Sequence, residues 1–212
     1  MPELSFACTE ARPEPYAASP SLQFLLRIGE STGVRMHSVA LRCQLRIEPH
    51  RRRYSGDEAA KLTDLFGDTS RWGETLKPMQ LATISVMVPS FRGEIEVPMS
   101  VPVTADLEVA TAKYFHGLDD GDIPLLLLFS GTAFYAAEAG LQVELVPWHL
   151  EVNYPLPVAV WRAVMAEHFP NATWLRLRAD TLATLQRYRT DRGIISLDDA
   201  VDELLKRAGE QP

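Results

Sequence analysis

A strict alternation of apolar and polar residues marks the clearest β-strand of this chain. The apolar positions are Val39, Leu41, Cys43, Leu45 and Ile47. A period of two over this length places one face of a strand in a hydrophobic core and the other face in water. We therefore expect these five side chains to be buried, and the intervening Arg42 and Arg46 to be exposed.

Weaker alternation predicts further strands on both sides of this one. They are expected at residues 2–10, 21–29, 81–88, 95–103 and 141–146. Pro98 and Pro102 have the parity opposite to the apolar residues of their segment. This favours an edge or bulged strand, because proline cannot donate a ladder hydrogen bond. Residues 11–20 contain three prolines and are expected to form a loop.

The stretch from Leu107 to Tyr135 has the pattern of two strands joined by an acidic turn. Leu107–Phe115 and Ile123–Tyr135 are the expected arms, and Asp119–Asp122 supplies the Asp and Gly residues that favour a turn. The second arm contains Leu125–Phe129, the most apolar run of the chain, which is too short to cross a bilayer. We expect this run to be a buried central strand.

Helical periodicity begins at a recognisable start signal. Ser55 and Glu58 have the spacing of a capping box, and Gly67 supplies a stop after the expected helix at 55–66. Helical patterns return after Pro157, with helices expected at residues 158–168, 181–192 and from residue 196 onward. Strands followed by helices are the order typical of α+β proteins.

These elements predict an α+β fold that is mainly β. We expect an antiparallel β-sandwich or twisted sheet with one inserted helix and C-terminal helices, since antiparallel sheets tolerate one wet face. A length of 212 residues fits a single domain over residues 1–212. Its β-rich core is expected at residues 1–152, with the inserted helix at about 55–66, and its helical part at residues 153–212.

The net charge of the chain disfavours some classes of binding partner. The formal net charge is −7, from 28 acidic and 21 basic residues, which argues against a nucleic-acid or anionic-membrane binder. No segment has the length and apolarity of a membrane span, and the first residues lack the pattern of a secretory signal. Cys8 and Cys43 form no metal-binding spacing, so we expect two free thiols and a cytoplasmic location.

One histidine and three aspartates come nearest to a metal site. His116 precedes Asp119, Asp120 and Asp122, and an imidazole with carboxylates can bind a divalent cation. The spacing is not that of a calcium loop, and a solvated turn is the competing interpretation. No nucleophile elbow, zinc motif or phosphate-binding loop occurs, so no residue is assigned a catalytic role, no cofactor is expected, and the protein is predicted not to be an enzyme.

Four consecutive residues form the candidate partner-binding segment. Arg51, Arg52 and Arg53 repel one another, and a carboxylate-rich or phosphate-rich surface would relieve that repulsion. Tyr54 adds an amphipathic ring of the kind that is enriched at interfaces. Because the segment joins a strand to a helix, its side chains are expected at the surface. A solvated strand end without a partner is the alternative.

Three tryptophans cluster in the sequence near the expected junction of strands and helices. Trp148, Trp161 and Trp174 either cement a helix to the sheet or dock a partner. Solvent exposure of the ring distinguishes the two roles, and the cementing role is the one we expect.

Four segments carry a resemblance to a known family. They are LRCQLRIEPHRRRY, RWGETLKP, AKYFHGLDDGDIPLLLLFSGTAFY and VPWHLEVNYPLPVAVWR. The chain resembles, over nearly its whole length, an uncharacterised and mostly actinobacterial family of about 200-residue proteins. Its members are commonly encoded beside genes of a nickel–iron hydrogenase and its maturation machinery, with no assigned activity. The resemblance implies a hydrogenase subunit or maturation factor as the protein partner.

The function expected is that of a non-enzymatic accessory or assembly protein that acts through protein–protein contacts. Two alternatives remain open. One is a metal- or small-ligand-binding protein that uses His116 and the Asp119–Asp122 turn, and the other is an enzyme with an unrecognised site. Tightly bound metal in protein purified without added metal would favour the first alternative.

Overall fold

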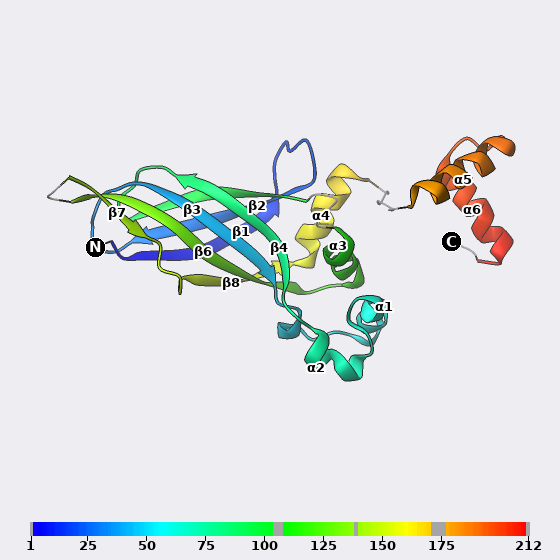
Figure 1. Ribbon diagram of the computed structural model, residues 1–212, viewed down its shortest axis with the longest axis horizontal. Helices are drawn as coiled ribbons and strands as arrows, with labels where there is room; N and C mark the ends of the chain where they lie inside the picture. The colour runs from blue at the N-terminus through cyan, green and yellow to red at the C-terminus, as the bar shows by residue number, and fades with distance from the viewer. Residues whose placement is uncertain (1, 104–107, 138–139, 171–176, 211–212) are drawn as a thin grey trace. The chain divides into compact units, whose positions relative to one another are not determined.

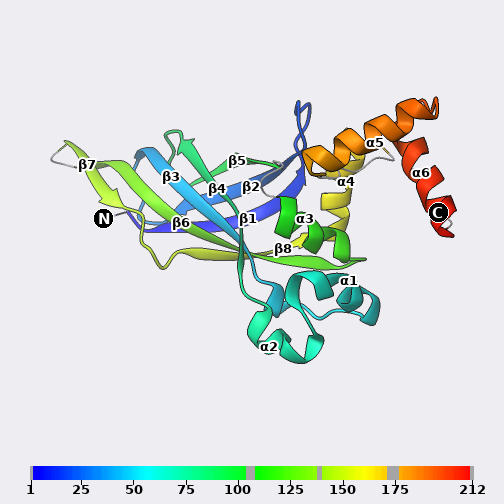
Figure 2. The same ribbon diagram turned by 45° about the vertical axis from the view of Figure 1, so that its right-hand side comes forward.

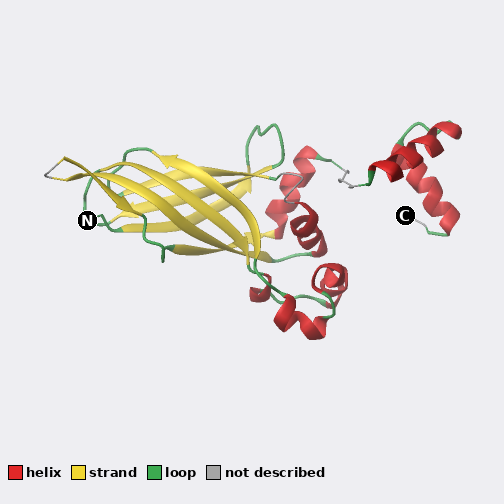
Figure 3. Ribbon diagram, viewed as in Figure 1, coloured by secondary structure: helices red, strands yellow, loops and turns green. Residues whose placement is uncertain are grey.

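The computed structural model describes residues 2–103, 108–137, 140–170 and 177–210. These residues fall into two compact units, Met1–Asn171 and Ala172–Pro212. The larger unit contains the described strands and helices α1 to α4, and the smaller unit contains helices α5 and α6 (Figure 1 and Figure 3). The single domain expected from the sequence stays a prediction.

The first of two antiparallel sheets is built on a central strand that is apolar on one face. Strand β2 (Ser21–Glu30) lies between β1 (Leu4–Pro13) and β5 (Glu94–Pro102). The expected edge position of the proline-bearing strand is confirmed, because β5 pairs with β2 on one side only within the described sheet. Strand β1 runs three residues into the segment that was expected to be a loop.

The second sheet is organised around two long neighbouring strands. Strand β3 (Met36–Ile47) lies between β4 (Met79–Val88) and β6 (Asp122–Ala137). The far side of β6 pairs with β8 (Glu151–Pro157) along its first half and with β7 (Gly140–Leu145) along its second half. The central position expected for the apolar run in β6 is therefore confirmed.

The two sheets pack face to face and enclose the core (Figure 2). Phe6 of β1 stacks on Phe129 of β6 with ring centroids 4.4 Å apart. The five alternating apolar residues of β3 are all buried and Arg42 is exposed, as predicted. Arg46 is only half-buried, with its guanidinium 3.5 Å from the carboxylate of Glu48. The predicted α+β fold with antiparallel sheets is confirmed.

Helices close one end of the sandwich (Figure 1). The expected inserted helix is α1 (Gly56–Phe66), preceded by the 3-10 turn η1 (Pro49–Arg51). A second 3-10 turn, η2 (Thr69–Arg71), leads into the short helix α2 (Trp72–Thr75). Helix α4 (Val158–His168) has the expected bounds.

The first arm of the predicted hairpin is wrong. Leu107 lies outside the described residues, and the chain from Glu108 to Gly117 forms helix α3 rather than a strand. The buried positions at its C-terminal end have helical spacing and include Tyr114, Phe115 and Leu118. Gly117 approaches α1 so closely that a Cβ atom there would lie 2.6 Å from Leu62. Helix α3 therefore packs on α1.

The smaller unit is a pair of helices, α5 (Ala179–Asp191) and α6 (Leu197–Ala208). The Ser196 hydroxyl caps α6 by accepting from the Asp199 N–H at 3.0 Å. The hydroxyl of Tyr188 donates to Glu203 at 3.3 Å, which joins the two helices. Leu204 of α6 is 40% exposed.

Candidate partner-binding site

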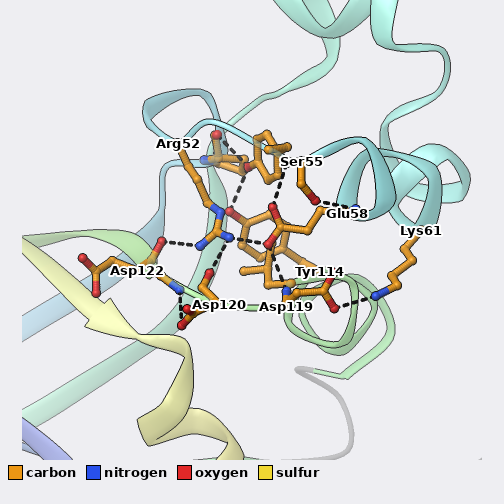
Figure 4. Close-up of polar contacts among 12 residues, drawn as sticks. Arg52, Ser55, Glu58, Lys61, Tyr114, Asp119, Asp120 and Asp122 are labelled. Carbon is orange, nitrogen blue, oxygen red and sulfur yellow. Dashed lines mark hydrogen bonds and ion pairs between the residues drawn. The ribbon is translucent and has the colours of Figure 1, made fainter.

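The arginine segment and the acidic turn, 70 residues apart in sequence, meet at the helical end of the sandwich. The contact is made by the Arg52 guanidinium (Figure 4). Its Nη1 donates to the carbonyl oxygen of Asp122 at 2.8 Å, and its Nη2 donates to that of Asp120 at 2.6 Å. A single side chain thus fixes the path of the turn through backbone carbonyls, not through the aspartate carboxylates.

Glu58 ties the same guanidinium to the start of helix α1. The Arg52 and Glu58 side chains form an ion pair and are 11% and 6% exposed. The Glu58 carboxylate also accepts the backbone N–H of Ser55 at 3.0 Å and that of Asp119 at 2.9 Å. Together with the Glu58 N–H that donates to the Ser55 hydroxyl at 3.1 Å, this confirms the predicted capping box.

The environment of Glu58 keeps its carboxylate charged. Burial raises the pKa of Glu58, but the N–H groups of Ser55 and Asp119 and the positive charge of Arg52 together hold that pKa below its ordinary value. A buried carboxylate with these donors stabilises the surrounding backbone only while it is ionised. The cluster is therefore a charged structural joint between the segment, the helix and the turn.

Aromatic residues pack beside the Arg52–Glu58 ion pair. The Tyr54 hydroxyl donates to the Pro49 carbonyl at 2.7 Å and lies 2.9 Å from the hydroxyl of Tyr114. Tyr114 is fully buried, and burial raises the pKa of its phenol. The ring of Trp72 meets that of Tyr54 edge-on, with centroids 5.1 Å apart, so helix α2 lies beside this cluster. Tyr54 thus serves mainly as packing.

Two of the three arginines remain available at the surface. Arg51 is exposed and donates to the side-chain oxygen of Asn153. Arg53 is exposed and makes no hydrogen bond or ion pair with the described residues. A shallow surface depression of about 410 Å³ is lined by Arg51, Arg52, Arg53, Gly121, Asp122, Pro124 and Pro155. The expectation of a surface position is confirmed for Arg51 and Arg53 and is wrong for Arg52.

The four residues considered for a metal do not converge. Asp119 pairs with the Lys61 ammonium at 2.6 Å, and Asp120 accepts the N–H of Gly121 at 2.7 Å. The carboxylate of Asp122 points away from the joint (Figure 4). His116 lines a separate small depression beside Arg162. Within the described residues, no group of three or more His, Cys, Asp or Glu side chains is placed to hold a metal ion.

The two thiols are packing residues. Burial raises the pKa of Cys43 and of Cys8 to about 12, so neither thiol forms the nucleophilic thiolate near neutral pH. Both cysteines are free. The interior position that the alternation predicts for Cys43 therefore agrees with its chemistry.

The tryptophans divide between the two roles considered for them. Trp161 is buried, as expected, and packs on Phe115 of helix α3 with ring centroids 4.4 Å apart, so this contact joins two helices. Trp148 is 89% exposed, so the packing expected of it is wrong. Trp174 lies outside the described residues. Among the helices that the structure describes, none is long and apolar enough to cross a membrane.

Solved structures offer only remote similarities. The chain aligns with a β-glucosidase from Kluyveromyces marxianus at 7% identity and a TM-score of 0.28, covering 73% of this chain and 15% of that one. β-Glucosidase 3B from Thermotoga neapolitana aligns at 11% identity and a TM-score of 0.27, covering 73% of this chain and 17% of that one. The putative ApaA protein from Bordetella pertussis aligns at 11% identity and a TM-score of 0.24, covering 73% of this chain and 93% of that one. The chain thus spans less than a fifth of either glucosidase, and scores this low transfer no activity.

The comparison with protein families gives a match over the full length. No curated protein matches the sequence significantly. A family model covers residues 1–212, and its description is that of a family of unknown function, which agrees with the uncharacterised family expected from the sequence motifs. The chain therefore belongs to the family of unknown function DUF6084.

Proposed function

We propose that this protein is a non-enzymatic accessory protein that binds an acidic surface of a protein partner through Arg51 and Arg53. One observation carries the proposal. Arg52 is used internally, where it pairs with Glu58 and holds two backbone carbonyls. The residues on either side of it are thereby fixed to a folded joint, while their own guanidiniums remain exposed.

The chemistry of these guanidiniums favours carboxylates. Arginine presents a planar fork that can bind a carboxylate through two parallel hydrogen bonds, and it is enriched at protein interfaces. The adjoining depression is shallow and open, with Pro124 and Pro155 on its wall, which suits the side chains of a protein surface. On a chain of net charge −7, such a local basic site would orient an incoming acidic partner.

The resemblance noted in the sequence motifs extends this proposal. It implies a hydrogenase subunit or maturation factor as the partner, in an actinobacterial setting, and the residue pattern adds a cytoplasmic location. Two free cysteines, Cys43 buried and Cys8 half-buried, fit a reducing compartment.

Affinity capture from the native cell tests the proposal. The full chain is compared with a double variant, Arg51→Ala with Arg53→Ala, and with a matched control, Arg35→Ala with Arg92→Ala. The control removes two exposed arginines that line a different surface depression. We expect the first variant to lose about tenfold or more of the captured partner at low salt and the control to lose little, since interface arginines often dominate binding. Equal capture by all three proteins would contradict the proposal.

A further inference from the structure

Strand β7 turns its apolar side chains toward solvent and not toward the core. Leu141, Val143 and Leu145 are 60%, 58% and 74% exposed. The intervening Gln142 and Glu144 are half-buried. This inverts the pattern of β3, in which the apolar residues face the core. A group of large apolar side chains exposed to solvent often marks an interaction surface, whereas single exposed apolar residues are common on any protein.

The apolar face continues across the sheet. The strand register places Leu145 beside Thr132, Val143 beside Phe134 and Leu141 beside Ala136. From Thr132 the same row continues through Ala40 of β3 to Met87 of β4, which is 66% exposed. This row of the outer face therefore carries no charged side chain. It lies at the end opposite to helices α1, α3 and α4 (Figure 1).

The backbone of β7 also presents a free edge. Among the described strands, β7 pairs only with β6. The Val146 N–H donates to the Gly131 carbonyl at 3.0 Å, so the even-numbered residues of this segment turn their backbone groups toward β6. The N–H and C=O groups of Leu141, Val143 and Leu145 consequently point outward. Natural edges are usually blunted by lysine, proline or a bulge. Residues 140–145 contain neither residue type and pair without a register shift.

One polar atom on the inner side of this strand lacks a partner. The Oε2 of Glu144 is buried and has no hydrogen bond within the described structure. Such atoms are rare, because a buried acceptor without a hydrogen bond destabilises the folded protein. A donor supplied along the free edge of β7 would satisfy it.

We propose that β7 pairs antiparallel with β7 of a second copy of this chain, around a two-fold axis at Val143. In this register Leu141 lies opposite Leu145 of the second copy, and Gln142 lies opposite Glu144. Directly opposed side chains in antiparallel strands share a face and lie about 5 Å apart. The Gln142 amide of each copy can therefore donate to the Glu144 carboxylate of the other copy. The two-fold axis makes this contact twice.

Neighbouring registers do not offer this match. A two-fold axis at Gln142 would place it opposite itself and would leave Glu144 opposite Gly140. An axis at Glu144 would oppose two carboxylates, which is destabilising. With the axis at Val143, the outward N–H and C=O groups of Leu141, Val143 and Leu145 all fall in hydrogen-bonded pairs. The self-complementary match identifies a second copy, rather than a foreign strand, as the occupant.

A residue swap tests the register, with sedimentation of the full chain as the measurement. We expect the native protein to dimerise, and Gln142→Glu to weaken the dimer about tenfold or more because it opposes carboxylates. Adding Glu144→Gln to that variant restores one amide opposite each carboxylate, so dimerisation should return to within about threefold of native. A native chain that stays monomeric, or a double variant as weak as the single one, would overturn the proposal.

A second pair of variants separates the edge from the face. Val143→Lys places two lysines opposite each other at the axis and should give monomers. Met87→Lys makes the same change at similar exposure on the opposite edge strand and should leave the dimer intact. Dissociation by both variants alike would show stacking of the apolar faces and overturn edge pairing. Neither substitution touches Arg51 or Arg53, so this test and the capture experiment can fail separately.

Discussion

Arg52 and Glu58 form an ion pair in which both side chains are almost withdrawn from water, at 11% and 6% exposure. Through this pair the arginine segment is joined to the first turn of α1 and to the turn after α3. The three consecutive arginines therefore have different roles. The middle one maintains the fold, and its two neighbours remain exposed, where the proposed partner would bind.

Replacing Arg52 with Ala should therefore destabilise the protein. The change leaves the buried Glu58 carboxylate without its cation and removes donors from the carbonyls of Asp120 and Asp122. Loss of one member of a buried pair costs about 3–5 kcal/mol, and we expect a value near the lower end because part of Arg52 is still exposed. Denaturant unfolding measures this loss.

Arg53→Ala is the matched control for that prediction. It removes the same charge from the next, exposed residue and should change the free energy of unfolding by less than about 0.5 kcal/mol. Adding Glu58→Gln to Arg52→Ala should recover part of the loss, because an amide is cheaper to bury than an unpaired carboxylate. If Arg52→Ala proved as mild as Arg53→Ala, the structural role of Arg52 would be refuted.

The stability supplied by Glu58 should depend on pH. Its pKa in the folded protein lies below its value in the unfolded chain, which is ordinarily about 4.3 for glutamate. The contribution is thus complete above the unfolded value and is lost as pH falls through the folded value. The difference in unfolding free energy between native protein and Glu58→Gln should shrink as pH falls from about 6 to about 3.

Glu74→Gln is the matched control, because it makes the same substitution at an exposed residue of helix α2 and should change the free energy of unfolding by less than about 0.5 kcal/mol. A stability difference for Glu58→Gln that does not change with pH, or that grows on acidification, would show that the Glu58 carboxylate does not stabilise the fold in its charged form.

Gly131 is a second point where the fold admits one residue type. Its φ is +143°, and a Cβ atom there would lie 2.1 Å from the carbonyl oxygen of Ala40 on the neighbouring strand. Gly131→Ala must push β3 and β6 apart, and we expect a loss of about 3 kcal/mol or more. Gly33 has a φ of +80° with open space around it, so Gly33→Ala should cost only about 1–2 kcal/mol. Equal unfolding free energies for the two variants would contradict this account.

Local patterns were sufficient for the elements whose signals lie within a few residues. The alternation in β3 and the Ser55–Glu58 capping box needed no knowledge of distant contacts, and both are present. The sequence does not predict strand β8, because Pro155 and Pro157 disfavour a strand. The sheet accepts them because β8 pairs with β6 alone among the described strands, and Pro155 lies opposite Pro124.

The candidate site was only half predictable. The sequence identifies three arginines and an acidic turn, and their charges suggest similar solvated roles for all. Which arginine is buried depends on the return of the chain after α3, which brings the carbonyls of Asp120 and Asp122 beside Arg52. The sequence does not reveal that return, because the segment before the turn has the pattern of a strand. Spacing of Tyr114, Phe115 and Leu118 was the available signal for the helix.

The salt dependence of partner binding tests the central claim most directly. The captured partner is purified and titrated with the native protein, with the Arg51→Ala, Arg53→Ala variant and with the Arg35→Ala, Arg92→Ala control, at about 50 mM and about 300 mM salt. The account predicts that native and control proteins bind tightly at low salt and lose about tenfold or more at high salt. It predicts that the first variant binds weakly at low salt and changes little. Identical affinities for native protein and the Arg51→Ala, Arg53→Ala variant at both salt concentrations would contradict the account.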